Sequence, residues 1–167
     1  MSSYAVTAVG PDAPGEVAAL AEALAGLGAN LEDASMTRLR GHFAMTMVAS
    51  VERTAAEVEQ ALEQAGTGLH VSVWDVTDDA AAPATGAPYR VTLHGADRPG
   101  LVATVARALA SYDGNITDLT CRLVGDLYVM TVEVDLVDAA PVTAALEQVG
   151  RDLGVTLHVE PVDEDVL

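Results

Sequence analysis

Residues 4–33 read YAVTAVGPDAPGEVAALAEALAGLGANLED, and residues 89–118 repeat them, 85 positions later, as YRVTLHGADRPGLVATVARALASYDGNITD. Aligned without a gap, residues 4–51 and 89–136 are identical at 17 positions. The best-preserved stretch is a turn, GPDAPG in the first copy and GADRPG in the second, rather than an apolar core segment. Because loops usually vary more than the elements they connect, the repeated Gly-x-Asp-x-Pro-Gly loop indicates a functional site.

Each copy predicts the same order of strands and helices. Short apolar or alternating runs are typical of strands, and apolar residues three and four positions apart are typical of helices. The first copy has strand-like runs at 4–10, 30–38, 42–51 and 69–76, and helix-like segments at 14–27 and 54–65. The second copy has strands from residues 89, 115, 127 and 155, and helices at 99–112 and 139–153. The β-α-β-β-α-β order predicts an α+β fold of two ferredoxin-like units, each a four-stranded antiparallel sheet with two helices on one face.

The repeat predicts two domains, residues 1–77 and 89–167. Between them, residues 78–88 (DDAAAPATGAP) have the composition of a flexible linker, which would allow the two units to pair. In the strand at 69–76, alternation puts Trp74 on the sheet face without helices, where it either lies near an interface or covers its own edge. Because bare sheet faces and edges commonly associate, we expect a homodimer.

The chain is strongly acidic. It has 167 residues, 50 % of them hydrophobic, and its 25 Asp and Glu against 8 Lys and Arg give a net charge of −17. The hydrophobic content argues against disorder, and the lack of a basic patch argues against direct binding to nucleic acid or to an anionic membrane. The N-terminus carries no signal-peptide pattern and the apolar run at 17–31 is too short to span a bilayer, so we expect a cytoplasmic protein. The single cysteine, Cys121, excludes an intramolecular disulfide and is expected to be buried.

In each copy the repeated loop leads from a strand into the start of a helix. Free backbone N–H groups and the positive end of the helix dipole favour a carboxylate at such a place. Gly15 and Gly100 would let a small ligand approach the backbone, while Asp12 and Asp97 add acceptors for an ammonium group.

Two asparagines complete the predicted constellation. Asn30 and Asn115 stand at the start of the strand after the helix, and an asparagine side chain can both donate and accept hydrogen bonds. Together with the loop, they would suit a small amino acid. A purely structural interpretation is also open, in which the aspartates cap helices, the glycines make turns, and the asparagines accept left-handed or bulged backbone.

The loop, the amphipathic helix after it, the Asn-[Leu/Ile]-x-Asp segment and the order of elements together resemble the ACT domain, a regulatory module that binds amino acids. The resemblance holds for both copies, which together make up nearly the whole chain. More narrowly, GADRPGLVATVARAL and GANLEDASMTRLRGHFAMTMVAS are similar to the tandem-ACT glycine cleavage system transcriptional repressor family. That resemblance implies a glycine-sensing regulator that acts by holding a DNA-binding activator and does not itself touch DNA.

The resemblance also implies which residues contact the ligand, typically at an interface between two ACT domains. The candidate ligand-binding residues are Gly95, Ala96, Asp97, Pro99, Gly100, Leu101 and Asn115 in the second copy, and Gly10, Asp12, Pro14, Gly15 and Asn30 in the first. The second copy keeps the common Asp-Arg-Pro-Gly form with Arg98, whereas the first has Ala13 there. We therefore expect the second copy to be the better site.

Catalysis and metal binding have little support in the sequence. His42, His70, His94 and His158 show no spacing typical of a catalytic or metal site, so we expect no enzyme, no metal and no cofactor. The expected partners are a small amino acid of the glycine or serine class and a protein such as a transcription factor of glycine or one-carbon metabolism. Two alternatives are a regulatory subunit of a metabolic enzyme and a dimerisation scaffold that binds no ligand.

Overall fold

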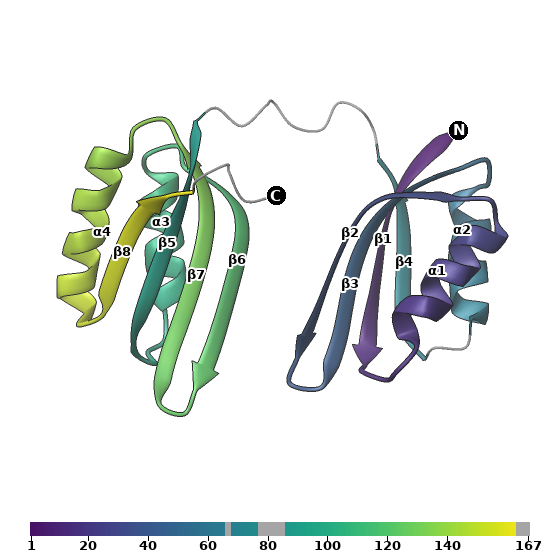
Figure 1. Cartoon of the computed structure of the whole chain (residues 1–167), viewed down its shortest axis with the longest axis horizontal. Coiled ribbons are helices and arrows are strands. Elements are labelled where there is room, and N and C mark those ends of the chain that lie inside the picture. The colour runs from purple at the N-terminus through teal and green to yellow at the C-terminus, as the bar shows by residue number, and fades with distance from the viewer. Residues whose placement is uncertain (66–67, 77–85, 163–167) are drawn as a thin grey trace. The chain divides into compact units, whose positions relative to one another are not determined.

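The chain folds into two compact units. The computed structural model describes residues 1–65, 68–76 and 86–162, and it separates into unit 1, Met1–Ala80, and unit 2, Ala81–Leu167 (Figure 1). Most of the predicted linker, residues 78–85, lies outside the described residues. Strand β5 begins at Ala87, so the last two residues of the predicted linker belong to this strand.

Unit 1 has the predicted β-α-β-β-α-β order. Its elements are β1 (Ser2–Pro11), α1 (Glu16–Gly26), β2 (Asn30–Leu39), β3 (His42–Val51), α2 (Ala55–Gln64) and β4 (His70–Asp75). The strands form an antiparallel sheet in the order β2-β3-β1-β4, and both helices cover one face of it (Figure 1).

Unit 2 repeats this plan and confirms the predicted α+β fold. Its elements are β5 (Ala87–Ala96), α3 (Leu101–Ala110), β6 (Asn115–Val124), β7 (Leu127–Leu136), α4 (Ala139–Leu153) and β8 (Thr156–Pro161). The sheet order is β6-β7-β5-β8, again antiparallel with both helices on one face (Figure 1).

The direction of the strands decides which loops can meet. Strands β1 and β2 both run antiparallel to β3, so they are parallel to each other, and α1 carries the chain back across the sheet. The same holds for β5 and β6, which both run antiparallel to β7. In each unit, the end of the first strand and the start of the second therefore lie at opposite ends of the sheet.

Each unit buries its own apolar core between the helices and the sheet. The core of unit 1 includes Val6, Leu20, Leu24, Met47, Val58 and Leu62. The core of unit 2 includes Val91, Leu93, Val105, Leu109, Val132 and Leu146. Removing such side chains from water is the main force that stabilises each unit.

Strand β4 and the residue before it confirm the predicted alternation of side chains between the helix-covered face and the open face of the sheet. Leu69 and Val71 are buried and Val73 packs against the core, whereas Trp74 is 47 % exposed. Cys121 was expected to be buried but is only half-buried. It packs against the edge of the unit 2 core.

The first turn of α2 is fixed by a capping box. Thr54 Oγ1 accepts a hydrogen bond from the Glu57 N–H at 3.3 Å, and the Thr54 N–H donates to Glu57 Oε2 at 2.8 Å. These bonds satisfy two backbone donors that a helix start otherwise leaves free. They hold the pKa of Glu57 below its ordinary value, chiefly through the hydrogen bond from the Thr54 backbone.

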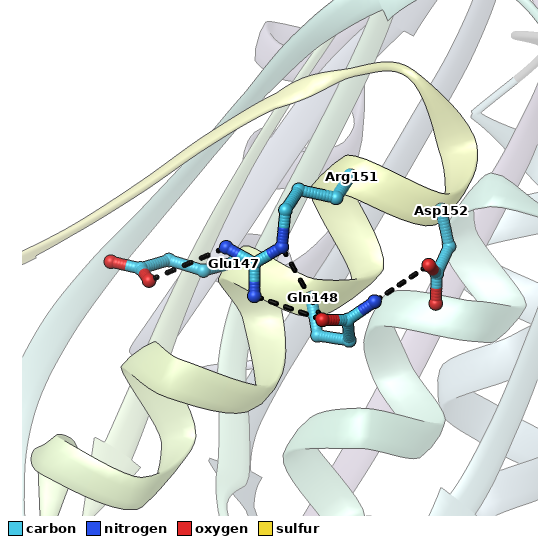
Figure 2. A network of polar contacts seen from close by, with 4 residues as sticks. All are labelled: Glu147, Gln148, Arg151 and Asp152. Atoms are coloured by element: carbon cyan, nitrogen blue, oxygen red, sulfur yellow. Dashed lines mark hydrogen bonds and ion pairs between the residues drawn. The ribbon is translucent and has the colours of Figure 1, made fainter.

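A network of polar side chains lies on the outer surface of α4 (Figure 2). Arg151 Nη2 donates to Gln148 Oε1 at 2.9 Å and Nη1 lies 3.8 Å from Glu147 Oε2, while Gln148 Nε2 donates to Asp152 Oδ1 at 2.7 Å. The Arg151 and Glu147 side chains are more than half exposed. Water competes for such groups, so we assign the network to the solvated face of the helix rather than to a site.

Candidate functional site

The repeated loop ends in a glycine that starts the helix. Helices α1 and α3 each begin two residues after the loop proline, Pro14 or Pro99, and not at it as predicted. The residue between, Gly15 or Gly100, forms the N-cap in left-handed backbone, with φ of 98° and 89°. A side chain would be strained in this conformation, so the repeated glycine is explained by the turn itself.

Among the described residues, no side chain caps either helix. In α3 the Leu101 N–H donates to the Arg98 oxygen at 3.5 Å, and the other N–H groups of each first turn are left for another partner. In α1 the first helical hydrogen bond runs from the Ala19 N–H to the Gly15 oxygen, and in α3 from Thr104 to Gly100. Neither Gly15 nor Gly100 supplies a side-chain acceptor. The interpretation in which the loop aspartates cap the helices is therefore wrong, and a small anion could bind there.

The first glycine of each loop has a packing reason. A Cβ at Gly10 would stand 2.8 Å from Leu69 Cδ2, and one at Gly95 would stand 2.6 Å from Val155 Cγ1. Both glycines let the end of the first strand approach the segment before the last strand. Their repetition does not by itself require a ligand.

The two loop aspartates have different surroundings. In unit 1, Arg38 Nη1 donates to Asp12 Oδ2 at 3.3 Å. In unit 2, Asp97 is exposed, and the position that matches Arg38 in the repeat is Leu123. Asp97 is thus the carboxylate that remains open to a ligand, in the copy expected to bind better. Arg38 was not predicted as part of the site.

The predicted asparagines do not join the loop of their own unit. Asn30 of β2 and Ser3 of β1 both lie opposite Ser50 of β3, so Asn30 is level with the start of β1. The loop lies at the other end of β1, around Pro11. Ser3 and Pro11 are eight residues apart along the extended strand β1, which corresponds to about 26 Å. In unit 2, Asn115 lies in the same way at the far end of the sheet from the loop.

Neither asparagine has left-handed backbone, and the bulges in β2 and β6 come just after them, at 31–33 and 116–118. The structural interpretation of these asparagines is therefore not supported. The predicted set, loop plus asparagine, is not brought together within one unit. The reason is the return path of the helix, which reverses the direction of the chain.

Beside the loop of unit 1 lies an open hollow that the sequence did not reveal. It is lined by Asp12, Ala13, Gly15, Glu16, Val17, Ala18, Ala21, Met36 and Phe43. Most of these residues are apolar. The exceptions are the carboxylates of Asp12 and Glu16. Glu16 is only 8 % exposed, and its Oε2 has no hydrogen-bond partner among the described residues.

The remaining candidates occupy the loop surface, with one exception. Ala96, Pro99 and Pro14 are exposed. Leu101, which was predicted to contact the ligand, is 2 % exposed and belongs to the core of unit 2.

Within the described part of the chain, no group of three or more His, Cys, Asp or Glu side chains could hold a metal ion. In the same residues, no helix is both long and apolar enough to cross a membrane.

Both units match the family model of the ACT domain, over residues 4–74 and 89–151. The chain belongs to the ACT domain family. It carries two ACT domains in tandem, as predicted, and is an ACT-domain regulatory protein.

Some relatives match a length of about one unit, and two structural neighbours match nearly the whole chain. A UPF0237 protein of Methanopyrus kandleri is 38 % identical over 77 residues, 44 % of this chain and 86 % of that protein. One from Methanococcus maripaludis is 35 % identical over 74 residues, 42 % of this chain and 82 % of that protein.

The crystal structure of a protein from Galdieria sulphuraria that is described only as unknown shares 28 % identity, with a TM-score of 0.83 over 97 % of this chain and 99 % of that one. Another, named provisionally as a glycine cleavage system transcriptional repressor, shares 16 % identity, with a TM-score of 0.72 over 98 % of both chains. At that identity, the second likeness shows a shared fold.

The two ACT units differ in chemistry at matched positions around the loop. Phe43 of unit 1 corresponds in the repeat to Tyr128 of unit 2, and Met36 corresponds to Cys121. A hydrogen bond with Cys121, together with burial and the negative charge of Asp97, raises the pKa of Tyr128 to about 12. The second ACT unit thus has a hydroxyl and a thiol where the first has two apolar side chains.

Proposed function

We propose that this ACT-domain protein senses a small amino acid of the glycine or serine class and thereby modulates a protein partner. The observation that carries the proposal is the start of α3, where Gly100 leaves the first N–H groups without a side-chain cap and exposed Asp97 stands beside them. The N–H groups would bind the ligand carboxylate and Asp97 its ammonium group. A ligand that fits this site needs both a carboxylate and an ammonium group, and a free amino acid carries both.

The asparagines can take part only if the ligand lies between two copies of the ACT unit. Asn115 and Asp97 belong to opposite ends of one sheet, so a single unit cannot present both to a small molecule. A second unit, from the same chain or another, would supply the asparagine. We therefore propose that ligand binding changes the association of ACT units, and that this change reaches the partner.

The proposed partner is a transcription factor of glycine or one-carbon metabolism, with the protein acting in the cytoplasm as a homodimer. The net charge of −17 supports contact with a protein and not with DNA directly. The neighbour named as a glycine cleavage repressor has the same fold over nearly all of both chains. It supports this choice of partner by fold alone.

The test is isothermal titration of the full chain with glycine, serine and a panel of larger amino acids. We expect saturable binding of one small amino acid, with the affinity lowered about tenfold or more by Asp97→Ala or Asn115→Ala, since a hydrogen bond to a charged group is lost. Glu63→Ala, which removes an exposed carboxylate on α2, is the matched control and should bind normally. If no amino acid produces heat at millimolar concentration, the sensor proposal fails.

A scaffold that binds no ligand is the second candidate. It is favoured by three exposed apolar residues at the β6–β7 hairpin: Leu123, Val124 and Leu127, which are 45 %, 64 % and 45 % exposed. Under this alternative, amino acids leave the thermal stability unchanged, and a charged residue at Val124 disrupts self-association. Light scattering of Val124→Glu, with and without glycine, separates the two candidates.

A further inference from the structure

Glu16 occupies a position that the fold uses for its core. Its counterpart in the repeat, Leu101, is 2 % exposed and packs with Val105 and Leu109 in unit 2. Glu16 is itself only 8 % exposed. The same position thus holds a buried carboxylate in one copy and a core leucine in the other.

The carboxylate has no partner that compensates for its burial. Glu16 Oε2 is buried and lacks a hydrogen bond among the described residues. Removing a charged oxygen from water without a partner is strongly unfavourable. The favourable effect of an acidic residue at the start of a helix is smaller, so the helix dipole alone does not account for Glu16.

The hollow supplies room for a partner. Glu16 lines it together with Asp12, and Val17, Met36 and Phe43 contribute apolar surface. Asp12 already accepts a hydrogen bond from Arg38. Glu16 is therefore the carboxylate of this hollow that remains without a cation.

We infer that Glu16 binds the protonated amine of an amino acid in the hollow of unit 1, next to a small aliphatic side chain of that ligand. The inference rests on the proposed function and adds the residue that selects the ligand in the first copy. The N–H groups at the start of α1 take the ligand carboxylate, Glu16 takes the ammonium group, and the apolar lining takes a methyl-sized side chain.

Unit 2 recognises its ligand differently. With Leu101 in its core, it has no buried carboxylate at this position, and exposed Asp97 is the carboxylate of its loop that is left to meet an amine. Discrimination between an amine and a neutral group should thus be stronger in unit 1, because a partly buried charge pair is less screened than an exposed one. The two copies are then sensors of unequal selectivity.

The experiment compares alanine with lactate, which has a hydroxyl in place of the ammonium group. Binding to the full, ¹⁵N-labelled chain is followed through the amides of residues 13–18 for unit 1 and 98–103 for unit 2. We expect alanine to shift the amides of residues 13–18 and to bind there about tenfold or more tightly than lactate. Glu16→Gln should reduce this preference to less than threefold.

A second substitution separates ligand binding from structure. Glu16→Leu, which copies unit 2, should abolish alanine binding at residues 13–18 and at the same time raise Tm, because an apolar side chain replaces an unpaired carboxylate. The control Glu22→Gln removes an exposed charge from the same helix and should change neither quantity.

Four outcomes would overturn the inference. If Glu16→Leu still binds alanine at residues 13–18, or if lactate binds there as well as alanine does, Glu16 does not hold the amine. If alanine shifts only residues 98–103, the proposed function stands and the inference on unit 1 fails. If no amino acid shifts either set of amides in the wild-type chain, both fail together.

Discussion

Arg38 and Asp12 form an ion pair beside the loop of unit 1, with 3.3 Å between Nη1 and Oδ2, and the matching residues of unit 2, Leu123 and Asp97, cannot form one. The Arg38 side chain is 67 % exposed. Arg38→Leu should therefore change the free energy of unfolding by less than about 1 kcal/mol. Urea denaturation measures this change.

The same substitution should alter ligand binding more than stability. Without Arg38, Asp12 becomes an open acceptor like Asp97, so the affinity of unit 1 for an ammonium-bearing ligand should rise. Leu123→Arg is the reciprocal change and should lower the affinity of unit 2. A large loss of stability in Arg38→Leu, with no effect on binding, would show that the ion pair serves only the fold.

Gly95→Ala should destabilise unit 2 by about 1–3 kcal/mol, as is usual when atoms are added to a tightly packed place. Its new Cβ would lie 2.6 Å from Val155 Cγ1 and 3.2 Å from Val155 Cα, and backbone cannot easily move aside. The matched control is Gly26→Ala, at the end of α1, where a Cβ meets nothing within 4 Å. The control should keep or raise Tm. Equal effects of the two substitutions in thermal denaturation would contradict the packing explanation for Gly95.

Much of the fold follows from the sequence because the signals are local and occur twice. The apolar spacing in residues 14–27 and the short apolar or alternating runs each predict an element, and the structure confirms their order. For α1 and α3 the predicted start lies two residues too early, since a proline after a strand resembles a first helical residue. The left-handed backbone of Gly15 sets the start of α1, and the sequence alone does not reveal the φ of a glycine.

The site was less predictable because it depends on the direction in which the chain crosses the sheet and on how deeply single side chains are buried. Asn30 follows α1 closely in sequence, but α1 returns the chain to the other end of the sheet, away from Asp12. Glu16 resembles an ordinary acidic residue in the first turn of a helix. Its match to Leu101 in the repeat was the available signal, because it marks the position as part of the core.

The capping box of α2 predicts a pH dependence of stability. In the folded chain the pKa of Glu57 lies below its ordinary value of 4.5, so this carboxylate binds protons more weakly in the folded than in the unfolded chain. Its contribution to stability is complete above pH 4.5, and it is lost as the pH falls through the lowered folded pKa. NMR titration of the Glu57 side chain should show the low value.

Thr54→Ala tests the same contact. It should return the pKa of Glu57 toward its ordinary value, and loss of the cap should by itself destabilise the chain by about 1 kcal/mol. Thr54→Ser keeps the hydroxyl and serves as the control. An unchanged Glu57 titration in Thr54→Ala would mean that the hydrogen bonds in the first turn do not set this pKa.

Tyr128 should titrate near pH 12 in the folded chain and near its ordinary 10 after unfolding. The hydrogen bond with Cys121 is the main cause, followed by burial and by the charges of Cys121 and Asp97. Because the folded pKa is the higher one, the stabilising contribution is complete below pH 10 and is lost as the pH rises through 12. Cys121→Ala should lower the folded value toward 10, and Asp97→Asn should lower it less, which ultraviolet titration of tyrosinate can follow in a variant with the other three tyrosines replaced by phenylalanine. If Asp97→Asn has the larger effect, the carboxylate and not the thiol governs the hydroxyl, and Tyr128 then lies close enough to Asp97 to share its ligand.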